Sequence, residues 1–121
     1  MLKQAIPLLH VTDVREAESF YCGVLGFRFY SAHRANEDMV NPCYMVVWRD
    51  SVVLHLSSFP GDGKPGGVVN IMVENVDHLY EEFSKKKVTV DLQPTDQTWG
   101  TREMYVKDIN QNCLRFFSEL K

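Results

Sequence analysis

The chain has few cysteines and no long apolar run. Its three cysteines, Cys22, Cys43 and Cys113, are widely spaced and form no CxxC pair. This pattern argues against a disulfide framework and indicates reduced thiols. No apolar stretch approaches the roughly 18 residues of a membrane-spanning helix, and no apolar signal segment follows Met1. We therefore expect a cytoplasmic protein with no membrane partner.

The sequence also lacks an excess of positive charge. Its formal net charge is -3, with 13 basic and 16 acidic residues, and no basic stripe marks a nucleic-acid surface. The lysines at 85–87 follow a helix-like run, where cations favour the C-terminal end of a helix. With 45% hydrophobic and 24% charged residues, the composition is that of an ordinary globular protein. We expect no nucleic-acid partner.

Familiar catalytic motifs are missing as well. There is no GxSxG nucleophile motif, and the segment 61–67 lacks the spacing and the following Ser or Thr of a phosphate-binding loop. No cysteine has an obvious histidine partner. Asp96, Glu103 and Asp108 are expected at edges and turns, where carboxylates usually cap the backbone or face solvent.

The sequence does contain one order of elements twice. The first half predicts a strand, a helix with Asp13 as its N-cap, and three more strands. After a glycine- and proline-rich segment, the second half repeats this order, with Asn75 as the N-cap; VTDV at 11–14 matches VENV at 73–76. In the first half, the predicted helix is 14–24, and the predicted strands are 5–11, one that starts at 27, 43–48 and 51–56. In the second half, the predicted elements are a strand at 68–73, a helix after 75, a strand at 88–90 and a final hairpin.

The repeat predicts an α+β fold of two tandem βαβββ modules with mixed sheets, within a single domain of residues 1–121. The modules are 1–58 and 68–121, and 59–67 is the linker. One module alone exposes an apolar sheet face, so two modules can cover each other. In this scheme Ile6 corresponds to Val68, and His55 corresponds to Arg115.

Two sequence markers carry a resemblance to a known family. The first is Asp13 followed by Phe20-Tyr21 and LGF at 25–27, and the second is WGTREMYVKD at 99–108. With the internal repeat, they resemble the vicinal oxygen chelate superfamily, which includes glyoxalase I, extradiol dioxygenases, fosfomycin resistance enzymes and bleomycin resistance proteins. The resemblance covers nearly the whole chain and implies that the mixed sheets are cupped.

Enzymes of that superfamily hold a divalent metal on residues of the first and last strands of each module. By motif, the corresponding positions here are Ile6, His55, Val68 and Arg115. Only His55 can bind a metal, because aliphatic side chains donate no lone pair and arginine stays protonated. The guanidinium would also repel a cation. We therefore expect no metal and no other cofactor.

Without a metal, the resemblance is nearest to the bleomycin resistance proteins. It implies a homodimer whose clefts sequester an aromatic, bleomycin-like small molecule without changing it. A divergent glyoxalase- or dioxygenase-like metalloenzyme is the alternative, and no catalytic residue is assigned. The candidate ligand-binding residues are His55, Ser57, Asn70, Trp99, Met104 and Arg115.

Three departures from the family pattern qualify this expectation. Asn70 stands where bleomycin binders tend to have a cleft tryptophan, and Arg115 suits an anionic or neutral aromatic ligand better than a cationic drug. In the turn 108–112, Gln111 takes the position of a glycine. If that position is left-handed, Asn110 or Asn112 could adopt the left-handed conformation instead.

Overall fold

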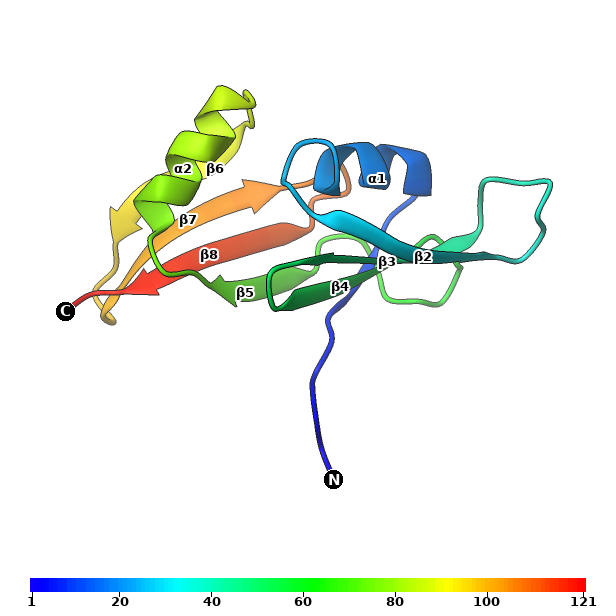
Figure 1. Ribbon diagram of the computed structural model, residues 1–121, viewed down its shortest axis with the longest axis horizontal. Coiled ribbons are helices and arrows are strands. Elements are labelled where there is room, and N and C mark those ends of the chain that lie inside the picture. The colour runs from blue at the N-terminus through cyan, green and yellow to red at the C-terminus, as the bar shows by residue number, and fades with distance from the viewer. The chain divides into compact units, whose positions relative to one another are not determined.

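The computed structural model describes residues 1–121, which form two compact units, Met1–Gly67 and Val68–Lys121. Each unit contains one helix and one mixed four-stranded sheet (Figure 1). The predicted α+β class and the repeated βαβββ order are confirmed. No helix in the chain is long and apolar enough to span a membrane.

The first unit places its opening strand beside its closing strand. β1 runs parallel to β4, and the sheet order is β1-β4-β3-β2. Helix α1 packs on β3 and β4, with Tyr21 and Leu54 fully buried between them. Its elements are β1 (Leu8–His10), α1 (Val14–Tyr21), β2 (Arg28–Arg34), β3 (Cys43–Arg49) and β4 (Val52–Ser57).

Helix α1 begins where the sequence predicts and ends earlier. Asp13 accepts a hydrogen bond from the Arg15 N–H at 2.9 Å, as an N-cap does. The predicted end near residue 24 is wrong, because α1 stops at Tyr21. The N–H groups of Cys22 and Gly23 both donate to the Glu18 carbonyl, so the chain turns out of the helix there.

The second unit repeats the first with different side chains. β5 runs parallel to β8 in the order β5-β8-β7-β6, and Asn75 caps α2 as predicted. Phe83 of α2 meets Phe116 of β8 edge to face at 5.5 Å between ring centroids. The strand predicted at 88–90 starts only at Val90. The elements are β5 (Val68–Met72), α2 (Val76–Lys85), β6 (Val90–Asp96), β7 (Thr101–Lys107) and β8 (Cys113–Glu119).

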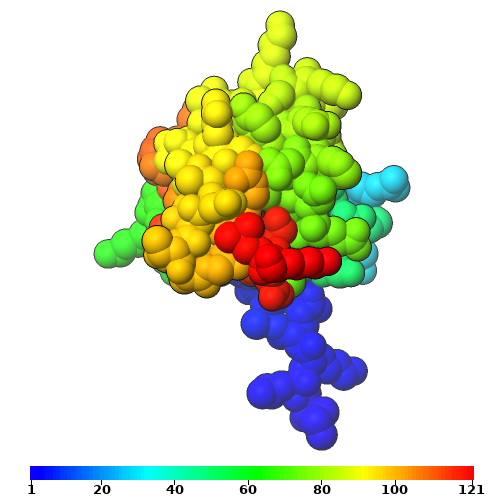
Figure 2. Space-filling model, turned by 90° about the vertical axis from the view of Figure 1, so that its left-hand side faces the viewer, coloured from blue at the N-terminus to red at the C-terminus, as the bar shows by residue number.

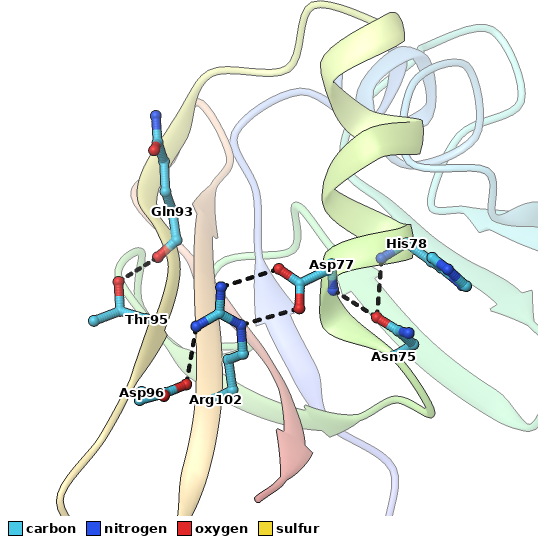
Figure 3. A network of polar contacts seen from close by, with 7 residues as sticks. All are labelled: Asn75, Asp77, His78, Gln93, Thr95, Asp96 and Arg102. Atoms are coloured by element: carbon cyan, nitrogen blue, oxygen red, sulfur yellow. Dashed lines mark hydrogen bonds and ion pairs between the residues drawn. The ribbon is translucent and has the colours of Figure 1, made fainter.

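Arg102 ties α2 to two strands of its sheet (Figure 3). Its guanidinium on β7 donates twice to Asp77 of α2, at 3.0 and 3.1 Å, and once to Asp96 of β6, at 2.9 Å. The hydrogen bonds that Arg102 donates to these carboxylates raise the pKa of Arg102 above its ordinary value. The planar fork of arginine fits this bidentate geometry, which a lysine could not reproduce.

The strand registers place His55 and Arg115 at equivalent positions. His55 of β4 lies opposite Leu8 of β1, and Arg115 of β8 lies opposite Asn70 of β5. Alternate residues of each strand face the helix, and the others face away from it. Both His55 and Arg115 lie on this second face, which we call the open face of each sheet.

The two ends of the chain differ in how they are held. Residues 1–6 form an exposed arm ahead of β1, seen in blue in Figures 1 and 2. At the other end, the Leu120 N–H donates to the Gly100 carbonyl at 2.9 Å. The C-terminal residues (red in Figure 2) therefore lie against the turn between β6 and β7 (orange), which also carries Trp99.

The turn between β7 and β8 is organised by Asp108. Its buried carboxylate accepts hydrogen bonds from the backbone N–H groups of Asn110 and Asn112, at 2.8 and 2.9 Å. Gln111 itself takes the left-handed conformation, with φ of 65°. The expectation that an asparagine would take that conformation instead is therefore wrong. The side chain at this position carries a backbone penalty that glycine would not.

Replacing Gln111 with glycine should therefore stabilise the protein. We expect Gln111→Gly to raise the free energy of unfolding by about 0.5–1 kcal/mol, because relief of the left-handed penalty exceeds the extra chain entropy of glycine. Urea denaturation measures the change. Asn110→Gly is the matched control and should lower stability, since Asn110 has no positive φ. A loss of stability in both variants would contradict this account.

Candidate ligand-binding site

Arg115 occupies the middle of the open face of the second sheet. Its neighbours across the sheet are Asn70 of β5 and Tyr105 of β7. The guanidinium carbon lies 4.8 Å from the centre of the Tyr105 ring, a cation–π contact that fixes the plane of the fork. The Nε atom is buried and has no hydrogen-bond partner. Arg115 thus presents a positioned cation whose donors are not all used.

The Glu103 carboxylate holds the side chains around Arg115 in place. One oxygen accepts hydrogen bonds from the Trp99 indole N–H at 2.9 Å and from the Thr101 hydroxyl at 2.6 Å. The other oxygen accepts from the Tyr105 hydroxyl at 2.9 Å. Glu103 is itself only 7% exposed. We call these four residues the Glu103 cluster.

The electrostatics of the Glu103 cluster keep its carboxylate ionised. Burial alone would raise the pKa of Glu103, but the hydrogen bonds from Thr101, Trp99 and Tyr105, with the charge of Arg115, outweigh it and lower the pKa. Burial, together with the bond to this carboxylate, raises the pKa of Tyr105. The phenol therefore remains a donor and the carboxylate an acceptor at neutral pH.

Trp99 is held at one end and exposed at the other. Its side chain is mostly exposed, and residue 99 as a whole is 64% accessible, while its N–H is fixed by Glu103. Gly100, with φ of 96°, turns the chain into β7 directly after it. An exposed indole with a fixed orientation is a surface on which a planar group can stack.

The open face of the first sheet carries a groove of different chemistry. It has a volume of about 610 Å³. The Tyr44 hydroxyl lies 2.7 Å from His55 Nδ1, and the two rings meet edge to face. Burial, and then the nearby Asp62, raises the pKa of Tyr44, so it stays protonated. This hydrogen bond engages Nδ1 of His55, so Nε2 is the ring nitrogen that it leaves for other partners. The lining includes Gln4, Tyr30, Val46, Trp48, Val53 and His55.

Two of the six predicted ligand-binding residues are not accessible. Ser57 is fully buried: its hydroxyl donates to Asp62 at 2.8 Å and accepts from the Phe59 N–H at 3.1 Å. Met104 is also fully buried, because it is paired with Phe116 on the helix-covered face. These two assignments are wrong.

The other four predicted residues lie where a ligand can reach them. His55 lines the groove of the first sheet, and Arg115 and Asn70 share the open face of the second. Trp99 is exposed at the turn before β7. Sequence reasoning missed Glu103, which it placed among edge carboxylates. The spacing of two residues between Trp99, Thr101, Glu103 and Tyr105 was the available signal, since such residues share a face.

The side chains do not fit the divalent metal used by enzymes of the vicinal oxygen chelate superfamily. Such sites need three or more nitrogen or oxygen donors converging on one point. No group of three His, Cys, Asp or Glu side chains has that arrangement. His55 stands opposite Leu8 in its sheet, and a guanidinium cannot coordinate a cation.

The chain belongs to the glyoxalase superfamily. The family described as glyoxalase superfamily protein matches residues 1–121. It is 28% identical to the bleomycin resistance protein of Geobacillus stearothermophilus and to that of Staphylococcus aureus, over 98% of each chain. The family resemblance seen in the sequence is confirmed.

Solved structures share the same fold. A glyoxalase-related enzyme from Clostridium phytofermentans superposes with a TM-score of 0.81 at 20% identity, over 99% of this chain and 97% of that one. A bleomycin-binding protein complexed with bleomycin superposes with a TM-score of 0.76 at 20% identity, over 98% and 99%. The fold therefore occurs in proteins described as enzymes and as binders, and the side chains must decide between them.

The lowered pKa of Glu103 makes a prediction about acid stability. Near pH 7, Glu103→Gln should be less stable than the wild type by about 1–2 kcal/mol, because an amide is a weaker acceptor for its three donors. The gap should be full above the ordinary carboxyl pKa of 4.5 and should close as the pH falls through the lower folded-state pKa.

Urea denaturation of both proteins between pH 7 and pH 3 measures this gap. Glu119→Gln is the control, because Glu119 lies exposed on the neighbouring strand. Its stability should follow that of the wild type throughout. A gap for Glu103→Gln that is unchanged at pH 3 would show that the charge of Glu103 has no part in the cluster.

Proposed function

We propose that this protein is a metal-free small-molecule-binding protein of the bleomycin resistance type, which sequesters an aromatic, drug-like ligand in clefts of a homodimer. The observation that carries the proposal is Arg115. A half-buried arginine stands on an open sheet face where metal-using relatives would need a ligand, and it is stacked on Tyr105. This arrangement favours binding of an organic molecule over metal-assisted chemistry.

The comparisons support the same proposal. The matched bleomycin resistance proteins align with 98% of this chain, so the similarity is not confined to one module. A structure with the same fold holds bleomycin.

Aromatic surfaces on both sheets suit a planar ligand. Trp99 is exposed beside the Glu103 cluster, and Tyr30 and Trp48 line the groove of the first sheet. Each stacked aromatic pair contributes about 0.5–1.5 kcal/mol beyond the burial of its area. His55 and Arg115 then supply the few polar contacts that orient a ligand in such a site.

Exposed apolar side chains support a homodimer. Leu8 on the first open face is 40% exposed, and Val68 and Met72 on the second are 54% and 60% exposed. Exposed apolar groups on a sheet face usually mark an interaction surface. A second copy of the chain would cover them and would enclose the ligand.

Titration with bleomycin tests the binding function. Each single-tryptophan variant reports on one unit: Trp48→Phe leaves the fluorescence of Trp99, and Trp99→Phe leaves that of Trp48. We expect saturable quenching of Trp99, and a loss of affinity of about tenfold in Trp99→Ala because stacking is removed. Sedimentation equilibrium should give a dimer. An absence of saturable binding would refute the drug-binding proposal.

Metal analysis tests the metal-free part of the proposal. Purified protein exposed to Fe²⁺, Mn²⁺, Ni²⁺ or Zn²⁺ and then dialysed should retain far less than one ion per chain, since a single imidazole binds such ions weakly. Its thermal unfolding should not shift with added metal, and His55→Ala should behave alike. One tightly bound ion per chain, or turnover of a thiol adduct or a catechol, would establish the metalloenzyme alternative.

A further inference from the structure

We infer that Arg115 binds an oxyanion group of the ligand, so that the preferred ligand is a planar aromatic acid. This inference rests on the proposed binding function, because it concerns the same open face of the second sheet. It goes further by naming the chemical class. Three features of the face support it: the charge of Arg115, its unused donor, and the groups beside it.

The charge of Arg115 has no direct partner in the protein. No carboxylate lies within ion-pair distance of it, in contrast to Arg102, which contacts two. The nearest ionised group that acts on it is Glu103, whose oxygens already accept three hydrogen bonds. A carboxylate offers about four acceptor positions, so most of those of Glu103 are in use. Glu103 orients the surroundings of Arg115 and leaves its fork free.

The Nε–H of Arg115 lacks an acceptor although it is buried. Native proteins leave few buried donors unsatisfied, and an exception calls for a partner. A carboxylate or phosphate bound side-on to the guanidinium would accept one hydrogen bond from Nε–H and a second from one terminal nitrogen. The Tyr105 ring, 4.8 Å from the guanidinium carbon, holds the fork in a fixed plane for this bidentate contact.

The groups beside Arg115 complete a site for an aromatic acid. The exposed amide of Asn70 stands opposite Arg115 in the next strand and can donate to an anionic oxygen. Trp99 and Tyr105 are hydrogen-bonded to the two oxygens of one carboxylate. The stacking surface of Trp99 is therefore held close to the ring that supports the guanidinium. An aromatic ring on Trp99 and an acid group on Arg115 can belong to one ligand.

Three matched probes test this inference: 2-naphthoate, 2-naphthamide and 2-naphthyl phosphate. Isothermal titration calorimetry on the wild-type protein should show that naphthoate binds at least about tenfold more tightly than naphthamide, because only the acid pairs with the fork. Tighter binding of the phosphate than of naphthoate would identify a phosphate ester as the class of oxyanion, and weaker binding would identify a carboxylate. Equal binding of all three probes would overturn the inference.

Variants assign the preference to a residue. Arg115→Gln should abolish the preference for acid over amide, and Arg115→Lys should keep only part of it, since lysine retains charge without the fork. Arg28→Gln is the matched control, because Arg28 also stacks on an aromatic ring, Trp48, but in the first unit. It should leave the preference intact. A preference that survives Arg115→Gln would overturn the inference, and the wild-type comparison stands even if that variant does not fold.

Bleomycin titrated in parallel separates the two proposals. Binding of bleomycin without binding of naphthoate would overturn the oxyanion inference and leave the drug-binding function standing. Binding of naphthoate through Arg115 without binding of bleomycin would support the inference and refute the drug-binding function. Binding of both would support both.

Discussion

The arrangement of the second open face depends on one buried carboxylate. Glu103 accepts from Trp99, Thr101 and Tyr105, and Tyr105 in turn carries the guanidinium of Arg115. A buried charge is tolerated only when hydrogen bonds replace its hydration, and three donors do so here. The same bonds fix the rings that would contact a ligand. Stability of the strand and shape of the site thus come from the same contacts.

Duplication supplies a common frame in which the two modules have diverged. The parallel registers put Leu8 against His55 and Asn70 against Arg115. The backbone frame is therefore the same, while one position holds an imidazole hydrogen-bonded to a phenol and the other a guanidinium over a phenol. A guanidinium donates no lone pair to a metal ion, so Arg115 cannot act as a metal ligand at its position. The frame remains useful because each face can evolve its own contacts.

The sequence predicted what depends on local pattern. The caps Asp13 and Asn75, the element order and the equivalence of His55 with Arg115 follow from the repeat and from capping chemistry. Met104, a candidate ligand-binding residue, is buried on the helix-covered face, since neighbouring residues of a strand point to opposite faces of a sheet. Glu103 was missed although Thr101 and Tyr105 alternate with it on one face of β7, because two-residue spacing shows a shared face and not which polar groups bond. Hydrophobic periodicity does not indicate which side chains form hydrogen bonds with one another.

An arginine at the position of a metal ligand changes the sign of the charge that the site can bind. A divalent ion attracts any electron-rich group, whereas a guanidinium selects by the direction of its planar donors. The ionised Glu103 near Arg115 offsets part of the positive charge of this face, which weakens long-range attraction. Short-range geometry then adds to selectivity, through the guanidinium held on Tyr105 and the indole fixed by Glu103. A site of this kind distinguishes ligands by shape and by hydrogen-bond direction as well as by charge.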